Sequence, residues 1–239
     1  MNIRILMCFI PGLALSLPGY CAPEEQYPLT RDALEKRYAE EVSAHRDYAA
    51  YSRQACAEGY PNIAHLFKAL SQSEGIHARN FKTLLSELGD NAGRTMPAAD
   101  TAIRDTRHNL RQAAAIERDE IDREYPAILE GIESEHHAAA IDNITYAWEA
   151  EKQHRDLIIK IQKAARRWFG LLVKRIEGEP SHYNVCNTCG STLVELPAQP
   201  CPVCGQPPSE YREIPAFTTA ACPLPPPAAE NEELFGDGD

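Results

Sequence analysis

Apolar residues recur three and four positions apart along most of the chain before residue 180, the spacing of amphipathic helices. From Thr30 to about Leu88 this pattern is broken only at residues 58–61 ("EGYP") and by a lone Gly75. Glycine and proline together are strong turn signals. The first third therefore predicts a helix, a tight turn and a second helix.

Two further helices follow a connector at residues 90–100. One runs from Thr101 to about Gly131, with a kink expected at Pro126 because proline lacks the N–H of a regular helix. The other runs from His137 to about Glu177, with an interruption expected at Gly170. Four long helices in one segment predict a mainly α chain built on a four-helix bundle, and we place this bundle at residues 28–178.

Two of the predicted helices carry the spacing Glu-x-x-His. It is found as Glu74 and His77 in "SEGIHARN" and as Glu151 and His154 in "EAEKQHRD". Residues three apart lie on one face of a helix. A single pair of this kind is usually part of a solvated polar face, but the second copy makes coincidence a poor explanation.

The two halves of the chain repeat their polar positions. Glu74 and Glu151 are 77 positions apart, and Glu41 and Glu117 are 76 apart. Residues at one level of an antiparallel hairpin are equidistant from its turn. The midpoint of 41 and 74 falls at 57.5, beside the first turn, and the midpoint of 117 and 151 falls at 134, in "ESEHH". All these side chains can therefore share one level of the bundle.

One glutamate from each of two helices and Glu-x-x-His from each of the other two is the ligand pattern of binuclear carboxylate centres. Carboxylate and imidazole ligands suit iron or manganese, and metal offsets the cost of burying the charges. Glu120 lies one turn after Glu117 and is either a spare ligand or a solvated neighbour. The candidate metal ligands are Glu41, Glu74, His77, Glu117, Glu120, Glu151 and His154.

The last third holds two Cys-x-x-Cys-Gly knuckles, Cys186 to Gly190 and Cys201 to Gly205. Two matched knuckles predict a mononuclear site with four thiolate ligands, Cys186, Cys189, Cys201 and Cys204. Iron and zinc use the same ligands, so both stay open. Disulfides are the competing use of cysteine, in particular in an exported chain. Cys56 is interpreted as a core residue, and Cys222 is left unassigned.

From Thr30 to about Pro215 the chain resembles the rubrerythrin family. The matching stretches are "EEVSAHRDY", "EGYPNIAHLF", "SEGIHARNF", "ERDEIDREYP", "EAEKQHRD" and the two knuckles. The resemblance implies a ferritin-like di-iron bundle followed by a rubredoxin-like domain, here residues 181–215, with one iron held by four thiolates. It departs at the second turn, and no aromatic residue follows the first knuckle, which weakens the case for iron over zinc there.

The resemblance also implies roles. Glu120 and His77 exchange on the metal as the irons are reduced, and Tyr48 and Tyr125 lie beside the centre. The implied activity is reduction of hydrogen peroxide with electrons from the thiolate iron and a redox donor protein, often across a head-to-tail homodimer. Two other classes stay open: a ferroxidase or iron-storage protein, and a non-enzymatic zinc-ribbon module on a helical scaffold.

The net charge and the two terminal segments of the chain add less to the functional interpretation. A formal net charge of −11 over 239 residues argues against nucleic acid as a partner. Residues 1–21 have one early Arg4, an apolar run and small residues before Ala22, the layout of a secretory signal peptide. Periplasmic location or export is therefore expected, with a cytoplasmic protein as the alternative. The Pro-rich, acidic segment at residues 216–239 is expected to be disordered.

Overall fold

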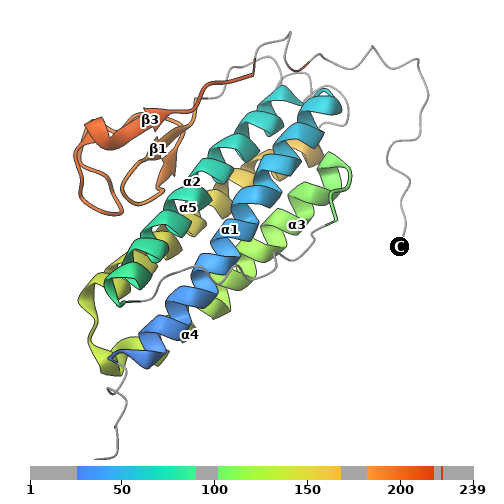
Figure 1. Cartoon of the computed structure of the whole chain (residues 1–239). Coiled ribbons are helices and arrows are strands. Elements are labelled where there is room, and N and C mark those ends of the chain that lie inside the picture. The colour runs from blue at the N-terminus through green and yellow to red at the C-terminus, as the bar shows by residue number, and fades with distance from the viewer. Residues whose placement is uncertain (1–25, 90–101, 168–181, 218–221, 223–239) are drawn as a thin grey trace, which may run out of the picture.

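The computed structural model describes residues 26–89, 102–167, 182–217 and 222. Helix α1 (Pro28–Ala57) and helix α2 (Pro61–Glu87) form an antiparallel hairpin (Figure 1). Gly59 has a φ of 79° in the turn between them, a backbone conformation that favours glycine. This hairpin lies where the helical spacing and the "EGYP" sequence predicted it.

The second half begins at helix α3 (Thr106–Asp119), where the Asp105 carboxylate accepts a hydrogen bond from the His108 N–H at 2.7 Å. A π-helical turn (Glu120–Glu124) leads into helix α4 (Tyr125–Ile132), and a short 3₁₀ turn (Glu133–Glu135) precedes helix α5 (Ala138–Arg167). The predictions for residues 168–177, including the interruption at Gly170, lie outside the described residues.

The single helix predicted for residues 101–131 is therefore wrong in detail. It starts five residues later and contains a π turn that ends at Glu124, two residues before Pro126, which occupies the first turn of α4. Proline cannot donate the backbone hydrogen bond of a regular helix, and wider π turns often accompany such a break at functional sites. The π turn starts at Glu120, one of the candidate ligands.

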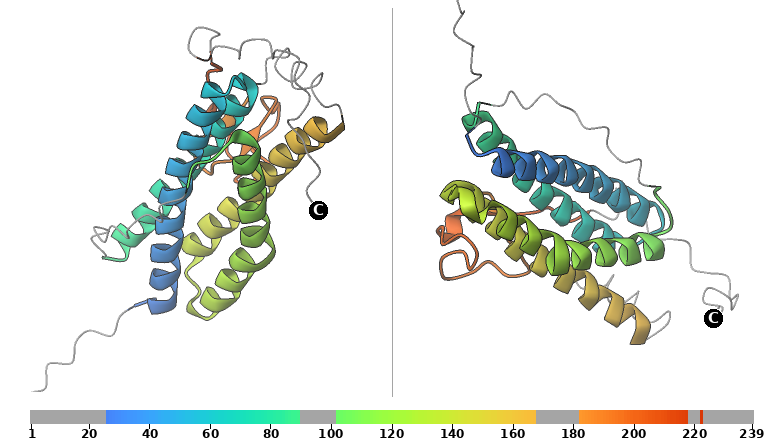
Figure 2. Two further views of the ribbon diagram at one scale, coloured as in Figure 1. Left: turned by 90° about the vertical axis from the view of Figure 1, so that its right-hand side faces the viewer. Right: turned by 90° about the horizontal axis from the view of Figure 1, so that it is seen from below.

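The hairpin of α1 and α2 packs beside the helices of the second half (Figure 2). The predicted four-helix bundle is thereby confirmed, with α3 and α4 together forming its third member. Within the described ranges, no helix combines the length and the apolar character that a membrane span requires.

Two apolar clusters fill the bundle, one on each side of a polar level. Along α2, Leu70 belongs to one cluster and Phe81 to the other. Along α5, Ile158 and Ile144 divide in the same way. The level between the clusters contains the Glu-x-x-His pairs. Well-packed apolar layers above and below thus exclude water from the charged groups.

The four cysteines lie in a small separate unit. Strands β1 (Asn184–Cys186), β2 (Thr192–Leu193) and β3 (Tyr211–Glu213) form an antiparallel sheet in the order β2-β1-β3. The unit lies against α2 and α5, on the flank of the bundle (Figure 1). The sheet brings both knuckles together, because β1 enters the first and β3 follows the second.

Cys56, near the end of α1, forms a disulfide with Cys222. Cys56 packs against an apolar cluster of the bundle, as interpreted from its sequence context, and the disulfide gives Cys222 the assignment that it lacked. The bond spans 166 positions of sequence. The predictions for the segments at residues 1–21 and 218–239, Cys222 excepted, fall outside the described residues.

Candidate metal centres

Two overlapping sets of four side chains lie in the polar level, and in each set the ligand atoms are all within 4.8 Å of one another. The two sets contain six different residues, and each of the six is no more than 2% exposed. The first set is Glu41, Glu74, His77 and Glu151, and the second is Glu74, Glu117, Glu151 and His154.

The two sets share Glu74 and Glu151. A glutamate that belongs to both sets can place one oxygen on each of two metal ions, so these two residues have the positions of bridging ligands. Glu41 and Glu117 complete the sets from α1 and α3, one for each metal. The arithmetic of hairpin levels predicted this meeting of four helices, and the geometry agrees with it.

Both histidines turn Nδ1 towards the carboxylates. His77 Nδ1 lies 3.0 Å from Glu74 and 3.2 Å from Glu151, and His154 Nδ1 lies 2.8 Å from Glu151. Their Nε2 atoms face the other way, towards the cysteine unit: 3.1 Å from the Cys189 carbonyl for His77 and 3.4 Å from the Thr192 hydroxyl for His154.

The contacts of the two Nε2 atoms decide which histidine tautomer is present and therefore which ring nitrogen can bind a metal. A carbonyl can only accept, so His77 must carry its proton on Nε2, which leaves Nδ1 free for a metal. The Thr192 hydroxyl donates to the Gly190 carbonyl at 3.0 Å and so can accept from His154 Nε2. Outer hydrogen bonds of this kind orient metal-binding histidines and increase their basicity.

The two tyrosines of the prediction touch ligands. The Tyr48 hydroxyl donates to Glu117 Oε1 at 2.5 Å, and the Tyr125 hydroxyl to Glu41 Oε1 at 3.0 Å. The other oxygen of Glu117 is buried and has no hydrogen-bond partner among the described residues. Such an oxygen is costly unless something positive meets it, so it is available to a metal ion.

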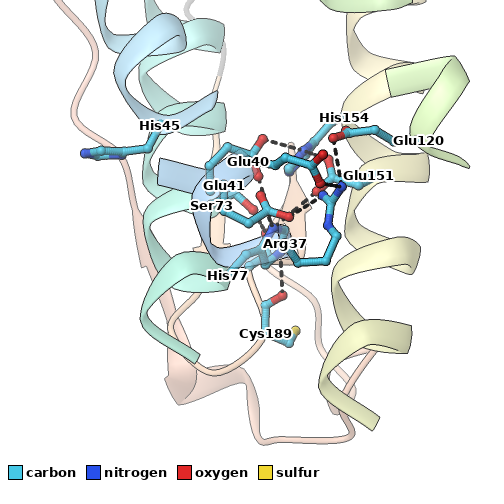
Figure 3. Close-up of polar contacts among 12 residues, drawn as sticks. Arg37, Glu40, Glu41, His45, Ser73, His77, Glu120, Glu151, His154 and Cys189 are labelled. Atoms are coloured by element: carbon cyan, nitrogen blue, oxygen red, sulfur yellow. Dashed lines mark hydrogen bonds and ion pairs between the residues drawn. The ribbon is translucent and has the colours of Figure 1, made fainter. Parts of the chain in front are cut away.

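Glu120 lies at the edge of the site, outside both sets of four. Its Oε1 accepts a hydrogen bond from Arg37 Nη1 at 3.1 Å (Figure 3). Arg37 is fully buried one turn before Glu41 and also donates to Glu41 Oε1 at 2.5 Å. His77 thus occupies an inner position and Glu120 an outer one.

Without metal, burial and neighbouring charges shift the pKa values of the carboxylates in both directions: burial raises the pKa of Glu151, but His154 and His77 outweigh it and hold this pKa well below its ordinary value. Burial, followed by the neighbouring Glu151 and Glu74, raises the pKa of Glu117 well above its ordinary value. Burial lowers the pKa of His154, but Glu74 and Glu151 outweigh it and raise this pKa to about 10. The metal-free cluster therefore binds protons, which metal ions displace as they bind.

The cysteine unit has the geometry of a tetrathiolate site. The Sγ atoms of Cys186 and Cys204 are 3.8 Å apart, and those of Cys189 and Cys201 are 3.6 Å apart. A tetrahedral metal with metal–sulfur bonds of about 2.3 Å needs sulfur–sulfur separations of about 3.8 Å. The four residues fit a mononuclear metal as predicted.

The first knuckle lies directly on the binuclear site. The Ser73 hydroxyl donates to the Gly190 carbonyl at 2.6 Å, and Gln153 Oε1 accepts from the Thr192 N–H at 2.8 Å. A Cβ atom on Gly190 would lie 2.3 Å from His77 Nε2. Only glycine permits this approach, so the backbone of a thiolate ligand, Cys189, reaches a ligand of the other centre.

The sequence did not reveal three of these groups. Arg37 lies four residues before Glu41, on the same face of α1. This spacing was the only indication in the sequence that Arg37 belongs to the site. Ser73 and Thr192 are small hydroxyl residues without a distinctive pattern. His45, by contrast, points away from the site (Figure 3) and bonds the Ser71 carbonyl at 2.6 Å, in agreement with its omission from the ligand set.

Fold and sites together define a ferritin-like protein with a binuclear carboxylate centre and a docked rubredoxin-like domain. The rubrerythrin family model matches residues 32–162. Rubrerythrin-2 of Clostridium acetobutylicum is 32% identical over 178 residues, which are 74% of this chain and 92% of that protein. Nigerythrin of Nitratidesulfovibrio vulgaris is 27% identical over 74% of this chain and 83% of its own. The chain belongs to the rubrerythrin family.

Solved structures agree. The mixed-valence state of nigerythrin superposes with a TM-score of 0.65 at 25% identity, covering 77% of this chain and 86% of that one. A bacterioferritin of Desulfovibrio desulfuricans, 19% identical with a TM-score of 0.60 over 65% of this chain and 90% of its own, shares the fold. The buried carboxylate and histidine set is therefore a di-iron site, and the four cysteines form a rubredoxin-like iron site, in a di-iron oxidoreductase of this family.

Proposed function

We propose that this protein reduces hydrogen peroxide to water at the di-iron site, with electrons delivered by the rubredoxin-like iron. The observation that carries the proposal is the 3.1 Å contact between the Cys189 carbonyl and His77 Nε2, which connects a ligand of one centre with a ligand of the other. An iron-storage protein has no use for such a connection. A zinc-ribbon module would have no use for the buried carboxylates.

The reaction consumes one hydrogen peroxide, two electrons and two protons and gives two water molecules. When bound, the two irons supply the two electrons and the Lewis acidity that cleaves the O–O bond. The chain supplies the rest. Tyr48 and Tyr125 hold hydroxyl protons against Glu117 and Glu41, and burial, together with nearby carboxylates, raises the pKa of Tyr48 well above its ordinary value. Both tyrosines therefore stay protonated and can donate.

The proposal keeps the exchange of Glu120 and His77. Glu120 lies beside the cluster in the outer position, and His77 lies within it. A carboxylate and an imidazole that alternate would let the ligand charge follow the charge of the irons. The π turn that begins at Glu120 supports this role, because such turns often mark functional positions.

A separate redox protein would reduce the rubredoxin-like iron, and we include a homodimer in the proposal. The contact between the first knuckle and α2 occurs within one chain. It supports a route for electrons that crosses no subunit boundary, so the dimer would not be needed for the internal transfer.

The test is peroxide consumption by the anaerobically reduced, iron-loaded protein. We expect rapid oxidation of both centres by one added equivalent of peroxide per electron pair, followed by continuous turnover when a reductant is supplied. Slow oxidation by peroxide, combined with accumulation of many irons per chain in air, would instead indicate a ferroxidase and would contradict the proposal.

We also propose that the protein is exported. The signal-like layout of residues 1–21 motivates this, and the Cys56–Cys222 disulfide supports it, because such bonds persist in oxidising compartments. Intact-mass analysis of protein from its natural host is expected to give a chain that begins at Ala22 and lacks two hydrogens at these cysteines. A chain that begins at Met1 with free thiols would rule out export.

A further inference from the structure

Arg37 is a buried charge that the metal ligands do not explain. Its side chain is 0% exposed, in a bundle core where charged residues are rare unless they are paired. A guanidinium has no lone pair to give to a metal and stays protonated at any physiological pH. It therefore acts on the site through its partners.

The guanidinium joins a ligand of α1 to the π turn. Nη2 donates to Glu41 Oε1 at 2.5 Å and to the Tyr125 hydroxyl at 2.8 Å, while Nη1 donates to Glu120 Oε1 at 3.1 Å and to Glu40 Oε2 at 2.9 Å. Figure 3 shows Arg37 between the ligand cluster and Glu120. Of its two possible ligand partners, Glu41 is in a set of four and Glu120 is not.

A carboxylate held by Arg37 is less free to bind a metal. Charge-assisted hydrogen bonds between arginine and carboxylate are strong and directional. Arg37 and the metal ions thus compete for Glu120. On Glu41 the guanidinium occupies Oε1, and the other oxygen, Oε2, faces His77 within the cluster and stays available to a metal. The inner position opposite Glu120 is filled by His77, whose Nδ1 is 3.6 Å from Glu41 and 3.2 Å from Glu151.

We propose that Arg37 is the positioning residue that holds Glu120 outside the divalent metal centre and so leaves its place to His77. Arg37 sets the balance between carboxylate and imidazole ligation. Because the hold on Glu120 is electrostatic and the charge on Arg37 is permanent, the charge of the metal ions decides when Glu120 is released. This inference rests on the metal centre and not on the peroxide reaction.

The test is a double-mutant cycle read as Mn²⁺ affinity. Calorimetry is performed on the full chain with zinc in the tetrathiolate site, which disfavours manganese. With Arg37 present, Glu120→Gln is expected to change the affinity less than about threefold, while His77→Gln weakens it about tenfold or more. With Arg37→Met, Glu120 is released to the metal, so Glu120→Gln then weakens binding about tenfold and His77→Gln less than about threefold.

Lys36→Met is the matched control. It removes a positive charge one residue away, on a side chain that is 52% exposed and contacts Glu40 and Glu124 but no ligand. We expect it to leave both dependences as they are. If Lys36→Met also made Mn²⁺ affinity depend on Glu120 instead of His77, the effect would come from net charge and the proposal would be overturned. Equal losses of Mn²⁺ affinity from Glu120→Gln with and without Arg37 would overturn it as well.

The proposal can be tested even if the Arg37→Met variant does not fold. Should Arg37→Met fail to fold by circular dichroism, the Glu120→Gln and His77→Gln variants in the Arg37 chain decide: a tenfold loss from Glu120→Gln overturns the proposal, and near-equality with the unmodified protein, together with a loss from His77→Gln, supports it. Peroxide turnover is measured separately. Its absence would overturn the proposed function while the affinities keep their order.

Discussion

Glu151→Gln is expected to empty the di-iron site and to reduce peroxide turnover by about a hundredfold or more. Glu151 belongs to both sets of four ligands, so its loss affects both metals, whereas most other ligands serve one. Glutamine keeps the shape of glutamate but replaces a carboxylate oxygen by an amide group, a poor ligand for iron. Metal analysis and steady-state peroxide consumption measure the effect.

Glu149→Gln is the control for this variant. Glu149 is on the same helix, two positions earlier, with a side chain that is 44% exposed and paired with Lys152. Glu149→Gln makes the same change of side chain at a residue that is not in either set of ligands, so iron content and turnover are expected to stay normal. Circular dichroism should show equal helix content in both variants. A Glu151→Gln protein that keeps its full iron content would contradict the assignment of Glu151 as a bridging ligand.

Gly190→Ala is expected to separate the two centres without emptying either. The added Cβ would lie 2.3 Å from His77 Nε2 and 2.6 Å from the Ser73 hydroxyl, so the first knuckle must move away from α2. Misplacement of reacting groups by about 1 Å can cost about a hundredfold in rate. We expect a loss of this order in electron transfer, followed by stopped-flow absorption of the rubredoxin-like iron after peroxide is added.

Gly205→Ala separates docking from backbone strain. Gly205 is the equivalent glycine of the second knuckle, with a φ of 73° against 79° for Gly190, but a Cβ there meets no atom within 4 Å. Both substitutions strain the backbone alike, and only the first collides with the bundle. Equal slowing in the two variants would mean that strain, and not docking on His77, controls the transfer.

The ligand set could be predicted because helical periodicity and hairpin symmetry are properties of the sequence. Glu74, His77, Glu151 and His154 had to share faces, and the turn positions fixed their level. The four cysteine ligands could be predicted equally well, since their spacing is itself the signal. Spacing alone thus predicted the four thiolates and six of the seven candidate ligands of the binuclear site, while the structure places the seventh, Glu120, outside both sets of four.

Other features depend on contacts between distant segments. A lone arginine on an amphipathic helix indicates a solvated face, so the burial of Arg37 had no sequence signal. The π turn at Glu120 depends on how α3 meets Pro126. Which of His77 and Glu120 lies inside depends on side-chain conformations and on Arg37. Gly190 was visible only as the last residue of the first knuckle, and its contact with α2 needed the assembled fold.

The disulfide between Cys56 and Cys222 has a topological consequence. It closes a covalent ring that contains α2 to α5 and the whole rubredoxin-like unit, and therefore both thiolate knuckles and every ligand except Glu41. Proteolytic cleavage at any single bond within this ring yields two polypeptides that stay linked until a reductant separates them. A nicked molecule can thus retain both of its iron sites on one covalent assembly.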